Sequence, residues 1–145
     1  MAIDESGKWW KGSTPQDMDE YIRLLSQEHY PIDDFRLSSC NCGGLEFELE
    51  FDKDEGCAKR RCLKCESEHF ICDSEEYAED AEFETWSCIE CNSKSTNVSV
   101  GYALRSSEDI KWIYIVGRCT SCGVLGCYAD WKIDYSPSLH LLDQA

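Results

Sequence analysis

The chain contains no long apolar run. Its uninterrupted hydrophobic stretches all fall short of the about 20 residues that a transmembrane helix needs. Its first five residues show no basic region followed by an apolar one, so we expect no secretory signal peptide. Both absences predict a cytoplasmic protein that has no membrane partner.

Basic residues are scarce. The 145 residues include 14 Lys and Arg against 29 Asp and Glu, which gives a formal net charge of −15. Because binding to a phosphate backbone usually needs a basic patch, this charge disfavours DNA or RNA as the main partner. The acidic residues serve either solubility or the binding of a basic protein. One local group of bases leaves nucleic acid open as an alternative, and it comprises Lys59, Arg60, Arg61 and Lys64.

Clusters of His, Asp and Glu at metal-ligand spacing are also missing. A catalytic metal site keeps one coordination position open for an activated water molecule, and its protein ligands usually come from such clusters. We therefore expect no catalytic residues and predict that the protein is not an enzyme.

Cysteine, in contrast, is abundant, with 11 residues in the chain. Cys88 and Cys91 form one pair separated by two residues, and Cys119 and Cys122 form another. In a reducing compartment such pairs favour metal over disulfide bonds. A hairpin between the two pairs would bring four thiolates together, which is the ligand set of a tetrahedral zinc site.

Another, less regular group of cysteines lies before these two pairs in the sequence. Cys62 and Cys65 keep the two-residue gap, but Cys40 and Cys42 are separated by a single residue, and Cys57 is a spare thiol near the same hairpin. This leaves open whether Cys40 or Cys57 completes the group. We assign two zinc ions to eight ligands, namely Cys40, Cys42, Cys62, Cys65, Cys88, Cys91, Cys119 and Cys122.

Alternating apolar residues predict the strands. Residues 45–51 place four apolar side chains on one face and three Glu on the other. Residues 96–105 and 110–118 predict a hairpin that is apolar on more of both faces, so we expect one face to pack against the other hairpin or against a helix. Cys72 and Cys127 occupy corresponding third strands and are expected to be small buried hydrophobes.

One helix start is clear. Thr14 offers a capping hydroxyl, Pro15 takes the first helical position, and Asp17 supplies an acid at the third. These signals predict a helix from about 15 to 28, packed on the strands. Its apolar stripe follows the spacing i, i+3, i+4, i+7 and is formed by Met18, Tyr21, Ile22 and Leu25.

The order of knuckle, hairpin, second knuckle and third strand occurs twice. Residues 61–65 leading to Cys72 parallel residues 118–122 leading to Cys127. Over about 40–132 the chain resembles tandem zinc ribbons with the rubredoxin-like knuckle. The resemblance implies a mainly β, small, metal-stabilised fold with two zinc-ribbon repeats of antiparallel strands and one N-terminal helix, but it implies no particular activity. The expected organisation is an N-terminal segment at 1–38, a first zinc ribbon at 39–73, an acidic linker at 74–86, a second zinc ribbon at 87–132 and a C-terminal tail packing back at 133–145.

We expect a non-catalytic zinc-binding protein that acts as a protein–protein interaction module or adaptor. One alternative is an acidic inhibitor or immunity-type protein that masks a basic partner. Another is a thiol redox or zinc-responsive sensor. Residues 73–84 hold seven acids and no base, interrupted by Tyr77 and Phe83, so this segment is either a solvated charge run or a docking strip for a basic protein.

Overall fold

The computed structural model describes residues 3–107, 109–135 and 137–145. The chain is mainly β, and every strand pair among these residues is antiparallel, which confirms the predicted fold class. The strands are β1 (Ile3–Asp4), β2 (Lys11–Gly12), β3 (Asp34–Leu37), β4 (Phe47–Asp52), β5 (Cys57–Cys62), β6 (Glu68–Phe70), β7 (Glu84–Thr85), β8 (Thr96–Leu104), β9 (Ile110–Cys119) and β10 (Leu125–Lys132). The helices are α1 (Asp17–Ser26) and two 3-10 helices, η1 (Ser74–Asp80) and η2 (Leu139–Asp143).

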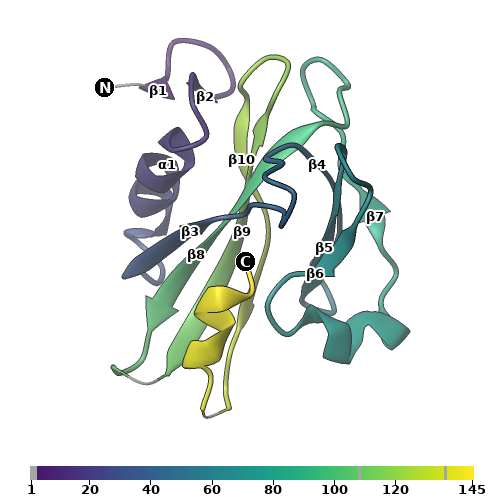
Figure 1. Cartoon of the computed structure of the whole chain (residues 1–145). Coiled ribbons are helices and arrows are strands. Elements are labelled where there is room, and N and C mark those ends of the chain that lie inside the picture. The colour runs from purple at the N-terminus through teal and green to yellow at the C-terminus, as the bar shows by residue number, and fades with distance from the viewer. Residues whose placement is uncertain (1–2, 108, 136) are drawn as a thin grey trace.

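One sheet joins the two predicted hairpins. Its strand order is β10-β9-β8-β4-β5-β6, with β3 also beside β8 and β7 also beside β4. β8 makes the connection, because its residues 99–102 pair with β3 while Thr96 pairs with Phe47 of β4. The β4–β5 hairpin is therefore hydrogen-bonded to the β8–β9 hairpin at one end only (Figure 1).

Strands β8, β9 and β10 form the middle layer of the molecule (Figure 1). On one face α1 packs through Met18 and Ile22 against Tyr114 and Val116 of β9. On the other face lie β4 and β5, and Phe47 belongs to the larger core between the two hairpins. The hairpin was expected to pack on either the helix or the other hairpin, and it packs on both.

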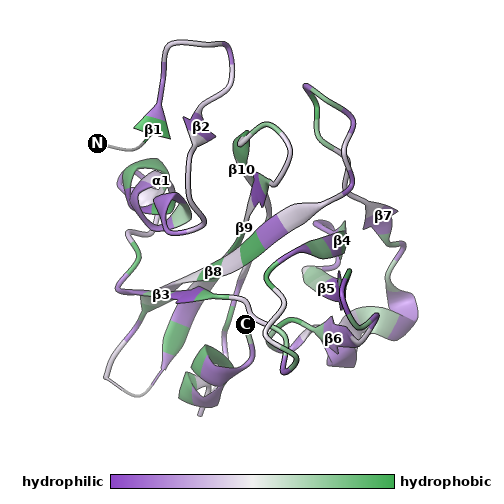
Figure 2. Ribbon diagram, turned by 45° about the horizontal axis from the view of Figure 1, so that its top comes forward, coloured by the Kyte–Doolittle hydropathy of each residue, from purple (hydrophilic) through white to green (hydrophobic). Residues whose placement is uncertain are grey.

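Successive residues of β8 point to opposite faces of the sheet and so contribute to the two cores in turn. Hydrophobic and hydrophilic residues also alternate along this strand (Figure 2). Val100 and Tyr102 belong to the core beneath β4 and β5. Gly101 faces α1, where an added Cβ would lie 3.1 Å from Ile32 and 3.3 Å from Ile22. Glycine at this position therefore allows the close approach of the helical layer.

The start of α1 differs from the predicted cap. No side chain caps the helix from Gln16, the residue before it. Instead the Asp17 carboxylate accepts hydrogen bonds from the backbone N–H groups of Ser13, at 2.7 Å, and Thr14, at 3.0 Å. Burial raises the pKa of Asp17, but these N–H bonds more than offset it and leave the pKa below its ordinary value. The predicted acid, and not the predicted hydroxyl, fixes the chain at this helix start.

Residues 74–86, expected as a linker, are attached to the first hairpin at both ends. The Ser74 hydroxyl accepts a hydrogen bond from the backbone N–H of Ala58 at 2.8 Å. The backbone N–H of Trp86 donates to the carbonyl of Leu49 at 2.8 Å. Between these anchors lie η1 and β7.

Residues 133–145 lie against the middle layer. Leu141 of η2 is 2% exposed within the larger core, and the Ser138 hydroxyl accepts a hydrogen bond from the backbone N–H of Ile110 at 2.8 Å. No helix in the described part of the chain is long and apolar enough to span a membrane.

Candidate metal centres

The structure gathers the eight predicted ligands into two groups of four. In each group the four sulfur atoms all lie within 4.8 Å of one another, and the closest pairs are 3.4–3.6 Å apart. Ligands in a tetrahedron with Zn–S bonds of about 2.3 Å are separated by about 3.8 Å, so both groups fit a zinc ion. The first centre is Cys40, Cys42, Cys62 and Cys65, and the second centre is Cys88, Cys91, Cys119 and Cys122.

Three of the four knuckles share one backbone geometry. In each, the N–H of the residue after the second cysteine donates to the carbonyl of the first cysteine at 2.8–2.9 Å. That residue adopts a positive φ, between 63° and 85°. Such a turn presents both sulfur atoms of a pair on the same side of the chain. The donor–acceptor pairs are Glu66–Cys62, Asn92–Cys88 and Gly123–Cys119.

The fourth knuckle is one residue shorter and depends on two glycines. The N–H of Gly43, whose φ is +90°, donates to the carbonyl of Cys40 at 2.8 Å. A Cβ at Gly44 would lie 2.8 Å from the Cys62 sulfur and 3.4 Å from the Cys42 sulfur. The absence of side chains here lets the irregular pair approach the β5 knuckle.

Cys57 is not in the first centre. It begins β5, whereas Cys62 ends this strand. Five residues of extended chain separate the two by about 17 Å. The structure therefore groups Cys40, and not Cys57, with the other three ligands of the first centre.

Backbone donors favour thiolates at several of these positions. Hydrogen bonds from the N–H groups of Cys65 and Lys64 lower the pKa of the Cys62 thiol. The hydroxyl and N–H of Ser67 lower the pKa of Cys65 to about 6. In the second centre burial raises the pKa of Cys119, but N–H groups of its own knuckle bring it down to about 7. Each centre is thus prepared to hold negative charge.

At two other ligands, Cys42 and Cys122, the surroundings oppose the thiolate. At Cys42 the N–H of Gly44 lowers the pKa, but neighbouring thiols, chiefly Cys40, and burial raise it to about 11. Burial and the neighbouring thiols, Cys88 first among them, raise the pKa of Cys122 to about 12. A divalent ion removes this repulsion, and zinc binds cysteine as the thiolate.

The other three thiols lie outside both centres. Cys127 lies in β10 as predicted, but Cys72 lies two residues beyond β6 with a φ of +57°, so the expected third strand ends before it. Both residues are partly and not fully buried. Burial raises the pKa of Cys57 to about 11 and the pKa values of Cys72 and Cys127 to about 12.

The bases of β5 do not share one surface. Lys59 pairs with Glu50 at 3.2 Å and Arg61 with Glu48 at 3.4 Å, so these two bases form a cross-strand charge ladder with the acids of β4. Arg60 lies on the opposite face and is only 6% exposed.

The buried contacts of Arg60 were not predicted. Its guanidinium donates to the backbone carbonyls of Ser39 and Ala145. The one available signal was strand parity, because Arg60 lies on the same face of β5 as the inward-facing residues Ala58 and Cys62. Its partners lie 21 and 85 residues away, and no local pattern indicates them.

The chain matches no model of a known protein family, no curated protein and no solved structure. The assignment of two metal centres therefore depends on the geometry of the cysteines themselves.

Proposed function

We propose that this chain is a non-catalytic protein–protein interaction module stabilised by two zinc ions, one in each of two zinc-ribbon-like halves. The observation that supports this most is the closed ligand set. Each centre offers four thiols at tetrahedral spacing, and four thiolates complete the coordination of zinc. Such a centre stabilises a fold and leaves no position for a substrate or an activated water molecule.

The bound metal supplies cross-links where the hydrogen bonds are few. β4 and β8 pair at one position only, so the ends of both hairpins depend on their knuckles. In small zinc domains the free energy of metal binding is largely free energy of folding. The residues of this chain hold the thiolates in place through the N–H bonds of the knuckle turns.

The binding surface that we propose is acidic. Four carboxylates of η1 are exposed, and none of them pairs with a Lys or Arg among the residues that the structure describes: Glu75, Glu76, Glu79 and Asp80. Tyr77 lies among them and is 39% exposed. Unpaired acids around an exposed aromatic ring form a surface that is complementary to a basic protein. Electrostatic attraction would also steer such a protein toward this surface.

An apolar contact surface at the two ends of the chain has less support. Trp9 packs against the larger core, and Trp10 packs against the helical core with its ring 6.0 Å from that of Tyr21. Leu141 is buried. These side chains are used within the fold, so we assign the partner contact to η1. The inhibitor alternative uses the same acidic surface and is a special case of this proposal.

The test is capture of partners from an extract of the native host, followed by association kinetics with the captured protein. Neutralising the four acids with E75Q, E76Q, E79Q and D80N should slow association and leave the zinc content unchanged. Raising the salt concentration should have the same effect, because exposed charges are screened beyond about 10 Å at 0.1 M. The matched control makes the same change of charge elsewhere, with E5Q, E20Q, E28Q and D54N.

The proposal predicts two results of this experiment. The η1 variant must associate more slowly than the control variant, and both must keep two zinc ions. Equal association rates for wild type and the η1 variant, with little effect of salt, would show that the acids serve solubility and that the partner binds elsewhere.

A further inference from the structure

The two centres differ in how well they are covered. In the second centre Cys88 is 1% exposed and Cys119 is 0% exposed, Cys122 is half-buried, and Cys91 alone is exposed. In the first centre only Cys62 is buried, while Cys42 and Cys65 are exposed. A chelator or a competing thiol therefore reaches the ligands of the first centre more easily.

The N-terminal residues account for the cover of the second centre. The backbone N–H of Gly12 donates to the carbonyl of Gly123 at 2.8 Å, and the carbonyl of Trp10 accepts from the N–H of Leu125 at 2.8 Å. The Lys11 ammonium pairs with Glu90, inside the first knuckle of this centre, at 2.9 Å. This short stretch ties both knuckles of the second centre to the N-terminal hairpin.

The first centre borders an open cavity of about 410 Å³ instead. One wall of the cavity is the loop that carries Cys40, and the opposite wall belongs to residues 138–145, which we name the clasp. The clasp contains η2 and closes over the end of the middle layer.

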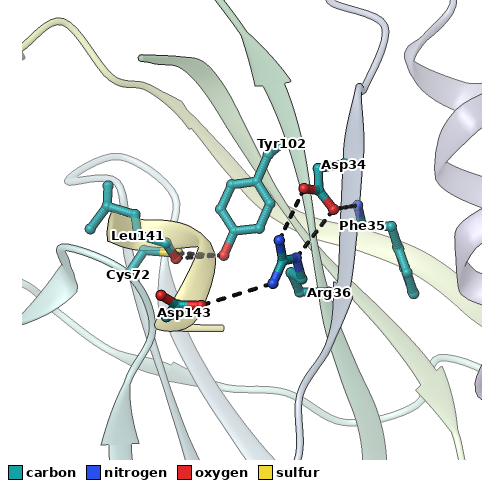
Figure 3. Close-up of polar contacts among 7 residues, drawn as sticks. All are labelled: Asp34, Phe35, Arg36, Cys72, Tyr102, Leu141 and Asp143. Atoms are coloured by element: carbon teal, nitrogen blue, oxygen red, sulfur yellow. Dashed lines mark hydrogen bonds and ion pairs between the residues drawn. The ribbon is translucent and has the colours of Figure 1, made fainter. Parts of the chain in front are cut away.

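Several tertiary contacts hold the clasp in place. The Tyr102 hydroxyl donates to the carbonyl of Leu141 at 2.8 Å, and an ion pair joins Arg36 to Asp143 at 3.9 Å (Figure 3). The carbonyl of Gln144 accepts from the backbone N–H of Cys72 at 2.8 Å and lies 3.0 Å from Nε2 of His69. Two of these contacts attach the clasp to β6 and the residues after it, beside the first centre. The residues concerned are Arg36, His69, Cys72, Tyr102, Leu141, Asp143 and Gln144.

Arg60 connects the clasp directly to the loop of the first centre. Its guanidinium donates to the carbonyl of Ala145, at 2.9 and 3.2 Å, and to the carbonyl of Ser39, at 3.4 Å. Ser39 precedes the ligand Cys40, and Arg60 stands two residues before the ligand Cys62. One buried side chain therefore contacts both the clasp and the loop that carries Cys40, and it lies on the strand that ends at Cys62.

We propose that the first centre gives up its metal before the second and that this loss releases the clasp. This inference assumes the zinc occupancy of the proposed function and adds a response to it. With the metal bound, Cys40 and Cys62 as shared ligands hold the Ser39 carbonyl near Arg60 and fix the end of β5. Without it, the Cys40 loop separates from β5 and the contacts of Arg60, His69 and Cys72 to the clasp weaken. The chain thereby converts a fall in available zinc into exposure of the surface beneath η2.

The first test follows the clasp while zinc is removed from the full-length chain with a chelator. Metal release should occur in two phases of one ion each, and alkylation should label Cys42 and Cys65 in the first phase. In the same phase hydrogen exchange should increase at the backbone N–H of Cys72, which donates to Gln144. Exchange within α1 should stay unchanged until the second phase.

The second test uses the reciprocity of coupled sites. If metal binding at the first centre stabilises the docked clasp, the docked clasp must in turn strengthen metal binding there. Tyr102→Phe removes the hydroxyl that bonds Leu141 and should weaken zinc binding at the first centre by about two- to tenfold, the range that one hydrogen bond gives. Tyr114→Phe is the matched control, since it removes a hydroxyl that donates to the carbonyl of Tyr30 at 2.9 Å on the helical face of the sheet. Competition with a chromogenic chelator measures both affinities.

The outcomes separate this inference from the proposed function. A purified chain that contains no zinc would overturn both. A chain with two zinc ions that loses the second-centre ion first, or that keeps the Cys72 amide protected after the first ion is lost, would overturn the clasp alone. Equal zinc affinities in the Tyr102→Phe and Tyr114→Phe variants would also overturn it.

Discussion

At the scale of single residues, the eleven cysteines divide into ligands and isolated thiols. Cys119 ends β9 inside the second centre, whereas Cys127 stands in the middle of β10 with its thiol 3.6 Å from the carbonyl of Ala129. The two therefore differ in what a serine at each position would remove. One loses a bond to metal, and the other loses a weakly polar group that packs against the helical core.

Cys119→Ser should lose the ion of the second centre and unfold that half of the chain, because binding free energy there is folding free energy. Cys127→Ser should keep both ions and lose about 1–3 kcal/mol of unfolding free energy, through a poorly paired hydroxyl. Metal analysis of the two purified variants, with urea unfolding, checks this. Equal metal loss would mean that the ligands are wrongly assigned.

The three thiols outside the two centres should also make the free energy of unfolding depend on pH in the alkaline range. The pKa values of Cys57, Cys72 and Cys127 are raised, chiefly by burial, above the about 8.5 of an unfolded thiol. Between about pH 8.5 and 11 the folded chain therefore binds more protons than the unfolded chain. Unfolding free energy should fall as pH rises through this window, and burial of Tyr102, which also raises its pKa, acts in the same direction at higher pH.

Urea unfolding of the zinc-loaded chain at pH 7.5, 9 and 10 measures this dependence. Cys127→Ala provides the comparison, because it removes one of the three thiols and should flatten the loss of stability. A stability that is constant over this range, or that rises, would contradict the burial of these thiols.

At the scale of elements, the turn glycines of the two centres offer a matched pair. Gly123 and Gly43 each follow the second cysteine of a knuckle and have φ values of +85° and +90°. A Cβ at Gly123 would lie 2.6 Å from the carbonyl oxygen of Gly12 in β2, whereas a Cβ at Gly43 meets no atom within 4 Å. The difference reflects the N-terminal hairpin that covers only the second centre.

Gly43→Ala should cost about 1–2 kcal/mol, the strain of a left-handed backbone with a side chain. Gly123→Ala should cost more, because it also forces β2 away from the knuckle and breaks the bond between Gly12 and Gly123. Thermal unfolding of the two variants checks the order of their midpoints. The account of the N-terminal cover fails if Gly43→Ala is the less stable protein.

The hairpin strands and the helix were predictable, because their signals are local. α1 lies within the predicted 15–28, and β8 and β9 match the predicted 96–105 and 110–118 within one residue. β4 begins two residues later than expected, since Leu45 belongs to the turn after the first knuckle. Alternation and capping act over a few residues, which a sequence shows directly.

Pairings between distant segments were not predictable. β3 joins the sheet beside β8, 66 positions away at the pair Phe35↔Gly101, and no turn signal links them. β2 lies at the second centre through Gly12 and Gly123, which are also far apart in the chain. Cysteine spacing indicated which residues could be ligands, but the contacts that distinguish the two centres come from such distant segments.

At the scale of the whole molecule, one eight-stranded sheet joins the segments that carry the two cysteine groups and has α1 on one side (Figure 1). The acids behind the formal charge of −15 differ in their partners, because several pair with bases of β5, while those of η1 pair with no Lys or Arg among the described residues. This distribution separates acids that are paired within the fold from the acids to which we assign the proposed partner contact.

Native mass spectrometry of the chain, purified without chelator and without added metal, is the most direct test of this account. It should give the mass of the polypeptide plus two zinc ions, with all eleven cysteines outside disulfide bonds. Loss of both ions at acidic pH should accompany loss of the folded state, because the thiolates that hold them become protonated. A metal-free chain that is folded through disulfide bonds would contradict the central claim.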